Sequence, residues 1–296
     1  MVKTSVIAKH DPRYPPLLRE LPQPPEQLFV RGNPSILHRR LVAIVGTRRC
    51  TDEGVHFTQL LVETLNRFPE IVTVSGLAFG IDAAVHQTAI RGRRPTVAVL
   101  ASGVDSVSPT SHERLAADLL KVGGCILSEY PAGTPAHKGR FPARNRIIAG
   151  LAGATVVIEA GEPSGALITA YAALDQNRDV LAVPGSPFNP VARGTNALLK
   201  RGAIPVTEPA DLLDALGLEL QLASPSATAD PVADGILAAL EAPRTVDQLA
   251  ETCTIPLARL SSVLSVLELD GRIRVLADGR VVRADTLTHG KTLSHR

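Results

Sequence analysis

The side chains best suited to chemistry lie in one ten-residue stretch, His137–Arg146. It reads His-Lys-Gly-Arg-Phe-Pro-Ala-Arg-Asn-Arg, so five basic side chains, counting the histidine, surround one aromatic ring. Cations that follow a phosphate backbone, beside a ring on which a base stacks, are the features of single-strand nucleic-acid binding. A charge run is often only a solvated surface, but the phenylalanine within this one favours binding. The candidate binding residues of this stretch are Lys138, Phe141, Arg144 and Asn145.

Pro142 suits the first turn of a helix that continues through residues 147–151. The N-terminus of such a helix adds free N–H groups and a favourable dipole for a phosphate. We therefore expect phosphates to meet the cations of this stretch, Lys138 and Arg144 among them, and a base to lie against Phe141.

Four further loops contain small residues that let a ligand approach the backbone. The first, Gly46-Thr47-Arg48-Arg49, is not a GxGxxG turn, and its arginine suits a phosphate better than a nicotinamide cofactor. In the second, Asp82 is the expected N-cap of the next helix. Each loop taken alone is equally well explained as a tight turn. The candidate residues in the four loops are Gly46, Arg48, Ser75, Gly76, Ser102, Gly103, Ser164 and Gly165.

Sequence signatures of catalysis are missing. There is no HExxH, no GxSxG and no GxxxxGK[ST] segment, and the three cysteines stand far apart without a CxxC pair. Cys125 lies in an apolar run and is expected to be a buried thiol. Asp105 and Glu159 have carboxylates, but nothing singles either out as a catalyst. We expect no catalytic residue, no metal and no cofactor.

The overall composition restricts the partners that the chain attracts. Its 296 residues include 31 Lys and Arg against 29 Asp and Glu, a net charge of +2, so a polyanion site must come from local clustering. The first twenty residues lack the apolar stretch of a signal peptide, and no run of eighteen apolar residues occurs. We therefore expect a cytoplasmic protein that does not associate with membranes.

The elements that must position these residues follow from short apolar runs that alternate with helical patterns. Aromatic residues are only 3% of the chain, so the core depends on aliphatic side chains, as in a parallel sheet covered by helices. The alternation predicts an α/β fold with a parallel sheet and helices on both faces. The strand-to-helix loops then share one edge of the sheet, where ligands bind in such folds. The expected strands are 41–45, 71–74, 96–100, 125–127, 154–158, 180–183 and 203–206.

The segments around this pattern define the expected domains. Residues 1–40 are rich in proline and are expected to form an extended arm, with 28–31 as one short strand. Residues 41–216 form the Rossmann-like domain, and the Ser-Pro-rich segment 217–231 is a linker. Residues 232–285 are expected to form a small winged-helix domain, and 286–296 a disordered tail.

The winged-helix prediction depends on three helical patterns at 232–241, 245–252 and 257–270, followed by two strands at 272–276 and 280–284. The third helix carries Arg259 against Glu268 and Asp270, which is a poor charge pattern for reading a major groove. We expect this domain to contact protein or to act as an auxiliary element.

Taken in order, the motifs resemble the DprA/Smf family of DNA-processing proteins. The similarity covers residues 11–207 and keeps both the order and the spacing of the motifs. After the aspartate at position 105, family members usually continue with Tyr-Pro, where this chain has Ser108-Pro109. The segments that carry the resemblance are Tyr14–Leu18, Phe29–Gly32, Val42–Arg48, Ser75–Asp82, Phe141–Leu151, Ser164–Ala170, Val183–Gly185 and Gly194–Asn196.

The resemblance implies an extended Rossmann fold that binds single-stranded DNA without marked sequence preference. It also implies loading of the recombinase RecA during natural transformation, single-strand-binding protein as a further partner, and a homodimer. Carried over by motif, Arg48 and Lys138 are the phosphate-contacting cations, Phe141 lies beside a base, and Arg144 and Asn145 line the pocket.

Two other functions stay open from the sequence alone. One is a nucleotide-processing Rossmann enzyme, such as a lysine-decarboxylase-like phosphoribohydrolase, although Pro184-Gly185-Ser186-Pro187 breaks the PGGxGT signature of that family. The other is a winged-helix regulator with a ligand-sensing domain, which would prefer one duplex site.

Overall fold

The computed structural model describes residues 4–219, 231–240, 242–269, 272–276 and 278–283. The chain divides into a larger unit, residues 1–219, and a smaller unit, residues 220–296. Most of the expected linker 217–231, and all of the expected tail 286–296, lie outside the described residues. Across the described ranges, no helix is both long enough and apolar enough to cross a membrane.

The larger unit contains a nine-stranded sheet in the order β1-β2-β6-β5-β4-β3-β7-β8-β9. All pairs from β6 to β9 are parallel. The expected strands are confirmed, each within one or two residues at its ends. The parallel strands are β3 (Arg40–Val45), β4 (Ile71–Ser75), β5 (Thr96–Leu100), β6 (Cys125–Ser128), β7 (Ala154–Val157), β8 (Asp179–Ala182) and β9 (Ile204–Pro205).

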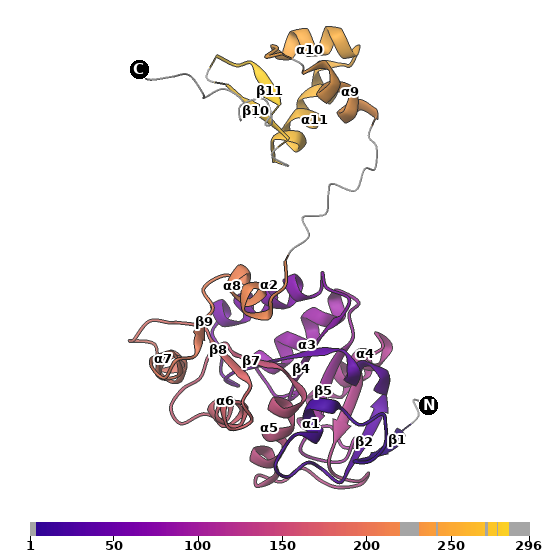
Figure 1. Cartoon of the computed structure of the whole chain (residues 1–296), viewed down its shortest axis with the longest axis vertical. Coiled ribbons are helices and arrows are strands. Elements are labelled where there is room, and N and C mark those ends of the chain that lie inside the picture. Colours follow the sequence, from indigo (N-terminus) through magenta and orange to yellow (C-terminus); the bar gives the residue numbers. More distant parts are fainter. Residues whose placement is uncertain (1–3, 220–230, 241, 270–271, 277, 284–296) are drawn as a thin grey trace, which may run out of the picture. The chain divides into compact units, whose positions relative to one another are not determined.

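Helices cover both faces of this sheet (Figure 1). One layer contains α2 (Asp52–Leu65), α3 (Ile81–Arg91), α4 (Glu113–Lys121) and α8 (Pro209–Leu216). The other layer contains α1 (Pro16–Arg19), α5 (Arg140–Leu151), α6 (Gly165–Asp175) and α7 (Arg193–Lys200). Short 3₁₀ turns lie at Pro34–His38, Thr110–His112 and Pro190–Ala192.

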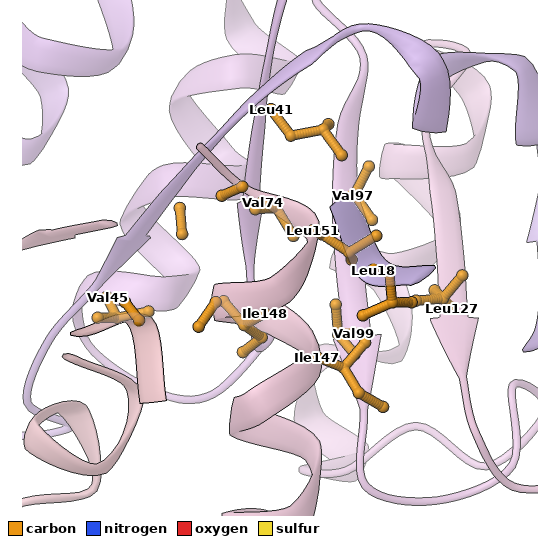
Figure 2. Packing of buried hydrophobic residues seen from close by; sticks show 14 of the residues in the cluster. Leu18, Leu41, Val45, Val74, Val97, Val99, Leu127, Ile147, Ile148 and Leu151 are labelled. Atoms are coloured by element: carbon orange, nitrogen blue, oxygen red, sulfur yellow. The ribbon is translucent and has the colours of Figure 1, made fainter. Parts of the chain in front are cut away.

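Strand β3 shows why the strands are continuous apolar runs. Leu41 and Val45 pack in the cluster that contains α5, whereas Val42 and Ile44 pack in the cluster that contains α2 and α3. Successive side chains of a strand point to opposite faces, so a strand covered on both sides must be apolar at every position. Figure 2 shows the α5 side of this core, where the α5 side chains Ile147, Ile148 and Leu151 lie over strand residues that include Val74, Val97 and Val99.

The N-terminal segment corrects the expectation of an extended arm. Strand β1 (Thr4–Ala8) pairs antiparallel with β2 (Gln27–Gly32), and β2 pairs antiparallel with β6, so the segment completes one edge of the sheet. The expected short strand at 28–31 lies inside β2 and is confirmed. Neither strand contains proline: the prolines of this segment lie between the two strands or after the second one. Tyr14 is fully buried, and its hydroxyl donates to the carbonyl of Pro25 at 2.8 Å.

The smaller unit has the expected three helices and a hairpin. Helix α10 (Val246–Cys253) begins with a capping box between Thr245 and Gln248. Strand β10 (Ile273–Val275) pairs antiparallel with β11 (Val281–Arg283). Helices α9 (Pro231–Ala239), α10 and α11 (Leu257–Leu269) share an apolar cluster with β10 and β11. The winged-helix prediction is confirmed.

Candidate functional site

The carboxyl ends of the strands position the candidate residues. From β3, the strands β4, β5 and β6 follow on one side and β7, β8 and β9 on the other, so the strand order reverses between β3 and β7. Ligands of open α/β sheets bind at such a point. A cavity of about 380 Å³ lies there, between the loops after β3 and β4 and the first turns of α5 and α6. It is lined by seven of the predicted residues: Gly46, Arg48, Phe141, Arg144, Asn145, Ser164 and Gly165.

A cation and an aromatic ring meet at this cavity. The guanidinium carbon of Arg48 lies 5.2 Å from the centre of the Phe141 ring. This contact joins the loop after β3 to the first turn of α5, which are 93 residues apart in the sequence. Arg48 is exposed, so its charge reaches the solvent beside the ring. The neighbouring Arg49 is also exposed and lines the same cavity.

Two helix N-termini open onto the cavity. Helix α6 begins after Ser164, whose hydroxyl accepts a hydrogen bond from the backbone N–H of Ala166 at 3.2 Å. Helix α5 begins after Gly139, and Pro142 occupies its first turn as the sequence predicts. The dipoles at these two ends favour an anion in the cavity. The first N–H groups of α5 already donate within the chain, Arg140 to the carbonyl of His137 and Phe141 to that of Lys138.

Arg144 corrects the expectation that its charge meets a phosphate. Its side chain is 4% exposed, and it donates to the carbonyls of Gly76, at 2.7 Å, and Val99. Burial lowers the pKa of Arg144 to about 10, and the nearby carboxylate of Asp82 opposes that shift. Arg144 therefore remains charged at neutral pH, and it forms the floor of the cavity while its hydrogen bonds hold the surrounding loops.

Asp82 lines the same cavity beside Arg144 and is not the N-cap of α3. The N-cap is Gly80, which has a φ of +74°. The carboxylate of Asp82 instead accepts from the backbone N–H groups of Gly76, at 3.1 Å, and Ala78, at 3.3 Å. Burial raises the pKa of Asp82, and the Arg144 guanidinium opposes this shift. A Cβ at Gly76 would lie 2.7 Å from both side chains, so the floor requires glycine there.

The other basic side chains of His137–Arg146 do not form a continuous row. Arg140 stacks on Tyr130 at 4.9 Å and donates to the carbonyl of Pro135. Arg146 forms a salt bridge with Glu129 at 2.5 Å. Lys138 is exposed in the segment before α5 but does not line the cavity. Within α5, helical periodicity explains why Arg140, Arg144 and Arg146 have different partners, because residues close in sequence point in different directions on a helix.

Three of the predicted small residues hold the loops in place and do not face the cavity. The Ser75 hydroxyl donates to the carbonyl of Ile44 at 2.7 Å. The carbonyl of Ser102 accepts from the Ser128 hydroxyl at 2.6 Å, and Gly103 packs against the backbone of Pro131. At these three positions, the contacts support the alternative interpretation of the sequence, in which the small residues form tight turns.

Comparison with known proteins decides the family. Residues 5–217 match the family model described as DNA recombination-mediator protein A, and residues 221–279 match the DprA winged helix domain. The chain belongs to the DprA/Smf family.

Several members of the DprA/Smf family are similar to this chain over most of its length. Protein Smf of Escherichia coli is 38% identical over 279 residues, which cover 90% of this chain and 74% of that protein. The X-ray structure of DprA from Streptococcus pneumoniae matches with a TM-score of 0.67 at 39% identity, over 72% of this chain and 74% of that one. A structure described as showing the single-stranded DNA binding mode of DprA from Helicobacter pylori matches with a TM-score of 0.65 at 27% identity. The match covers 73% of this chain and 96% of that one.

Sequence reasoning missed several cavity residues in this family member. Arg49 follows Arg48 directly in the sequence, but the sequence alone does not show that both side chains line the same cavity. Ile168 and Thr169 lie one turn into α6, and only the packing of α6 against α5 brings them to the cavity.

Glu159, one of the two carboxylates left open by the sequence, has a structural role. It accepts from the hydroxyl of Thr51, at 2.6 Å, and from the backbone N–H of Thr51, at 2.9 Å, at the start of α2. Asp105, the other carboxylate, accepts from the backbone N–H of Gly133 at 2.9 Å.

Proposed function

We propose that this chain binds single-stranded DNA, without marked sequence preference, at the cavity between β3 and β7. The observation that carries the proposal is the Arg48 guanidinium held 5.2 Å from the centre of the Phe141 ring at the cavity mouth. An exposed cation beside an aromatic ring supplies the contacts for a phosphate and for the base that follows it.

The contacts available at the cavity support binding without a marked sequence preference. Arg48, Arg49 and the N-termini of α5 and α6 suit phosphate, which carries no sequence information. Every base has a π-face, so stacking on Phe141 does not select one base over another. The cavity side chain with a hydrogen-bonding edge suited to reading a base, Asn145, already donates to the carbonyl of Gly165 at 3.0 Å.

Fluorescence anisotropy with labelled oligo-dT and a duplex of equal length tests this proposal. We expect tight binding of the single strand, weak binding of the duplex, and a large loss of affinity in Arg48→Ala. Lys138→Ala should lose less, because the exposed Lys138 side chain does not line the cavity. Arg67→Ala is the matched control, because Arg67 is exposed beyond the last residue of α2, at the opposite edge of the sheet. Equal affinity for both DNAs, unchanged by Arg48→Ala, would contradict the proposal.

The wider role proposed here follows from the family. We propose that the chain acts in the cytoplasm as a homodimer, loads RecA onto single strands covered by single-strand-binding protein during natural transformation, and catalyses no reaction itself. Strand exchange by RecA on coated DNA, with and without this protein, tests the loading step. Release of free base from nucleoside monophosphates would support the phosphoribohydrolase alternative instead.

A further inference from the structure

Phe188 is the most exposed large apolar side chain among the described residues. Its exposed fraction is 91%, whereas the other exposed large apolar side chains in the described ranges lie between 38% and 56%. Half-exposed apolar residues scattered over a surface are ordinary. A phenylalanine ring that is almost wholly exposed to water is unusual, because burying such a ring against a partner is favourable.

The ring stands at the tip of a turn that the chain holds in place. The backbone N–H of Asn189 donates to the carbonyl of Ser186 at 3.0 Å, and the N–H of Phe188 donates to the Ser186 hydroxyl at 3.3 Å. Pro187 occupies the second position of this four-residue turn, where its fixed φ is favoured. Because the turn is already ordered, a partner that covers the ring loses little conformational entropy.

Both ends of the loop are anchored as well. The side chain of Asn196 accepts from the backbone N–H of Gly185 at 3.2 Å and donates to the carbonyl of the same residue at 2.9 Å. On the other side, the Asn189 side chain accepts from the N–H of Val191 at 3.1 Å. The exposed Phe188 ring therefore belongs to a loop whose two ends are held by hydrogen bonds.

The loop lies directly beside the proposed DNA cavity. Ala160 donates from its N–H to the carbonyl of Val191 at 2.7 Å and accepts from the N–H of Gly194 at 2.8 Å. Ala160 belongs to the loop after β7 that leads to Ser164 and Gly165 in the cavity wall. Strand β8, which leads to Phe188, is the neighbour of β7. Helices α6 and α7, which follow these two loops, also lie side by side in Figure 1.

The charges around the loop suit a polyanion. Arg193 is exposed at the start of α7, and α7 contains no acidic residue. Arg193 and Lys200 take part in none of the salt bridges among the described residues. The neighbouring loop contains two acidic residues, Glu159 and the exposed Glu162, and the carboxylate of Glu159 already accepts hydrogen bonds from Thr51. Phe188 and Arg193 are both exposed, lie five residues apart in the sequence, and are the same two residue types as Phe141 and Arg48.

We propose that Phe188 and Arg193 form a second contact point for the single strand, in which a base stacks on the Phe188 ring and a phosphate meets Arg193. This inference rests on the proposed function, because the same strand leaves the cavity and crosses the loop after β7 to reach Phe188. A strand that occupies both positions gains affinity over one that fills the cavity alone.

Two lengths of oligo-dT separate the second contact point from the cavity: about 5 and about 20 nucleotides, within and beyond the ~4–16 nucleotides typical of single-strand modules. We expect Phe188→Ala to weaken the long oligomer about fivefold, the effect of losing about 1 kcal/mol of stacking, and to leave the short one unchanged. Phe188→Tyr keeps the ring and should bind both as the wild type does. Leu174→Ala, at a 47% exposed residue near the far end of α6, is the matched control.

The outcomes separate this inference from the proposed function. If the wild type shows no preference for single strands at either length, the proposed function fails. If the wild type binds but Phe188→Ala holds the long oligomer equally well, only the second contact point fails. Light scattering adds a third arm: a change in molar mass in Phe188→Ala would mean that another copy of the chain covers the ring, which also overturns the inference. An unchanged melting temperature shows that the variant folds.

Discussion

Replacing Arg144 by methionine distinguishes a structural side chain from a DNA-contacting one. Methionine keeps much of the length of the arginine side chain but removes its charge and its donors. The substitution leaves the carbonyl of Gly76, which accepts at 2.7 Å, and the side-chain oxygen of Asn145, which accepts at 3.1 Å, without the guanidinium. It also leaves the buried Asp82 without its nearby positive charge.

The expected loss of stability follows from these contacts. Arg144 and Asp82 are both buried and attract each other through their opposite charges. Removing one member of such a buried pair costs about 3–5 kcal/mol, because the other charge is left uncompensated. A domain of this size is stable by only about 5–15 kcal/mol, so the variant loses a large share of its free energy of unfolding. Arg48→Ala removes an exposed side chain and should change the free energy of unfolding by less than about 0.5 kcal/mol.

Urea unfolding of the full chain, followed by circular dichroism, measures both effects. The double variant Asp82→Asn/Arg144→Met should lose less than the sum of the two single losses, because each single change leaves an unpaired partner behind. The reasoning is refuted if Arg144→Met unfolds within about 1 kcal/mol of the wild type, since surface side chains behave in that way.

Three further predictions follow. Phe141→Ala should weaken single-strand binding by about 1–3 kcal/mol, whereas Phe141→Tyr retains most of it, as anisotropy would show. Burial lowers the pKa of His86 to about 3, so the unfolded chain takes up a proton there first. Stability should therefore fall by up to about 1.4 kcal/mol per pH unit as the pH drops from about 6.5 towards 3, and His86→Gln should show a shallower slope in pH-dependent melting. Deleting residues 224–296 should leave most single-strand affinity intact, and a large loss of affinity in a gel-shift titration would contradict an auxiliary role of the winged-helix domain.

The parallel strands could be predicted because their burial is visible in local sequence. A strand covered on both faces is apolar at every position, and the loops after β3, β4 and β7 were placed correctly for that reason. Strand β1 was not predicted, because the prolines between β1 and β2 dominate the local pattern, whereas the expected strand at 28–31 lies inside β2. The pairing of β2 with β6 depends on residues about a hundred positions away, which no local pattern contains.

The candidate site was predictable in its chemistry and less so in its geometry. The pairing of Arg48 with Phe141 follows once their loops share one edge of the sheet. The burial of Arg144 does not, because its partner carbonyls at Gly76 and Val99 lie 68 and 45 residues away. A run of basic residues shows which charges are present, and helix packing decides which of them reach the solvent.

The salt dependence of single-strand affinity in the wild type and in Arg48→Ala tests the central claim most directly. Each phosphate contact adds a slope of about −0.7 to the plot of log affinity against log salt for single strands. If Arg48 meets a phosphate at the cavity mouth, Arg48→Ala should bind more weakly and reduce the slope by about one such contact, while Arg67→Ala keeps the wild-type line. Wild-type affinity and slope in Arg48→Ala would contradict the account and place the DNA elsewhere on the protein.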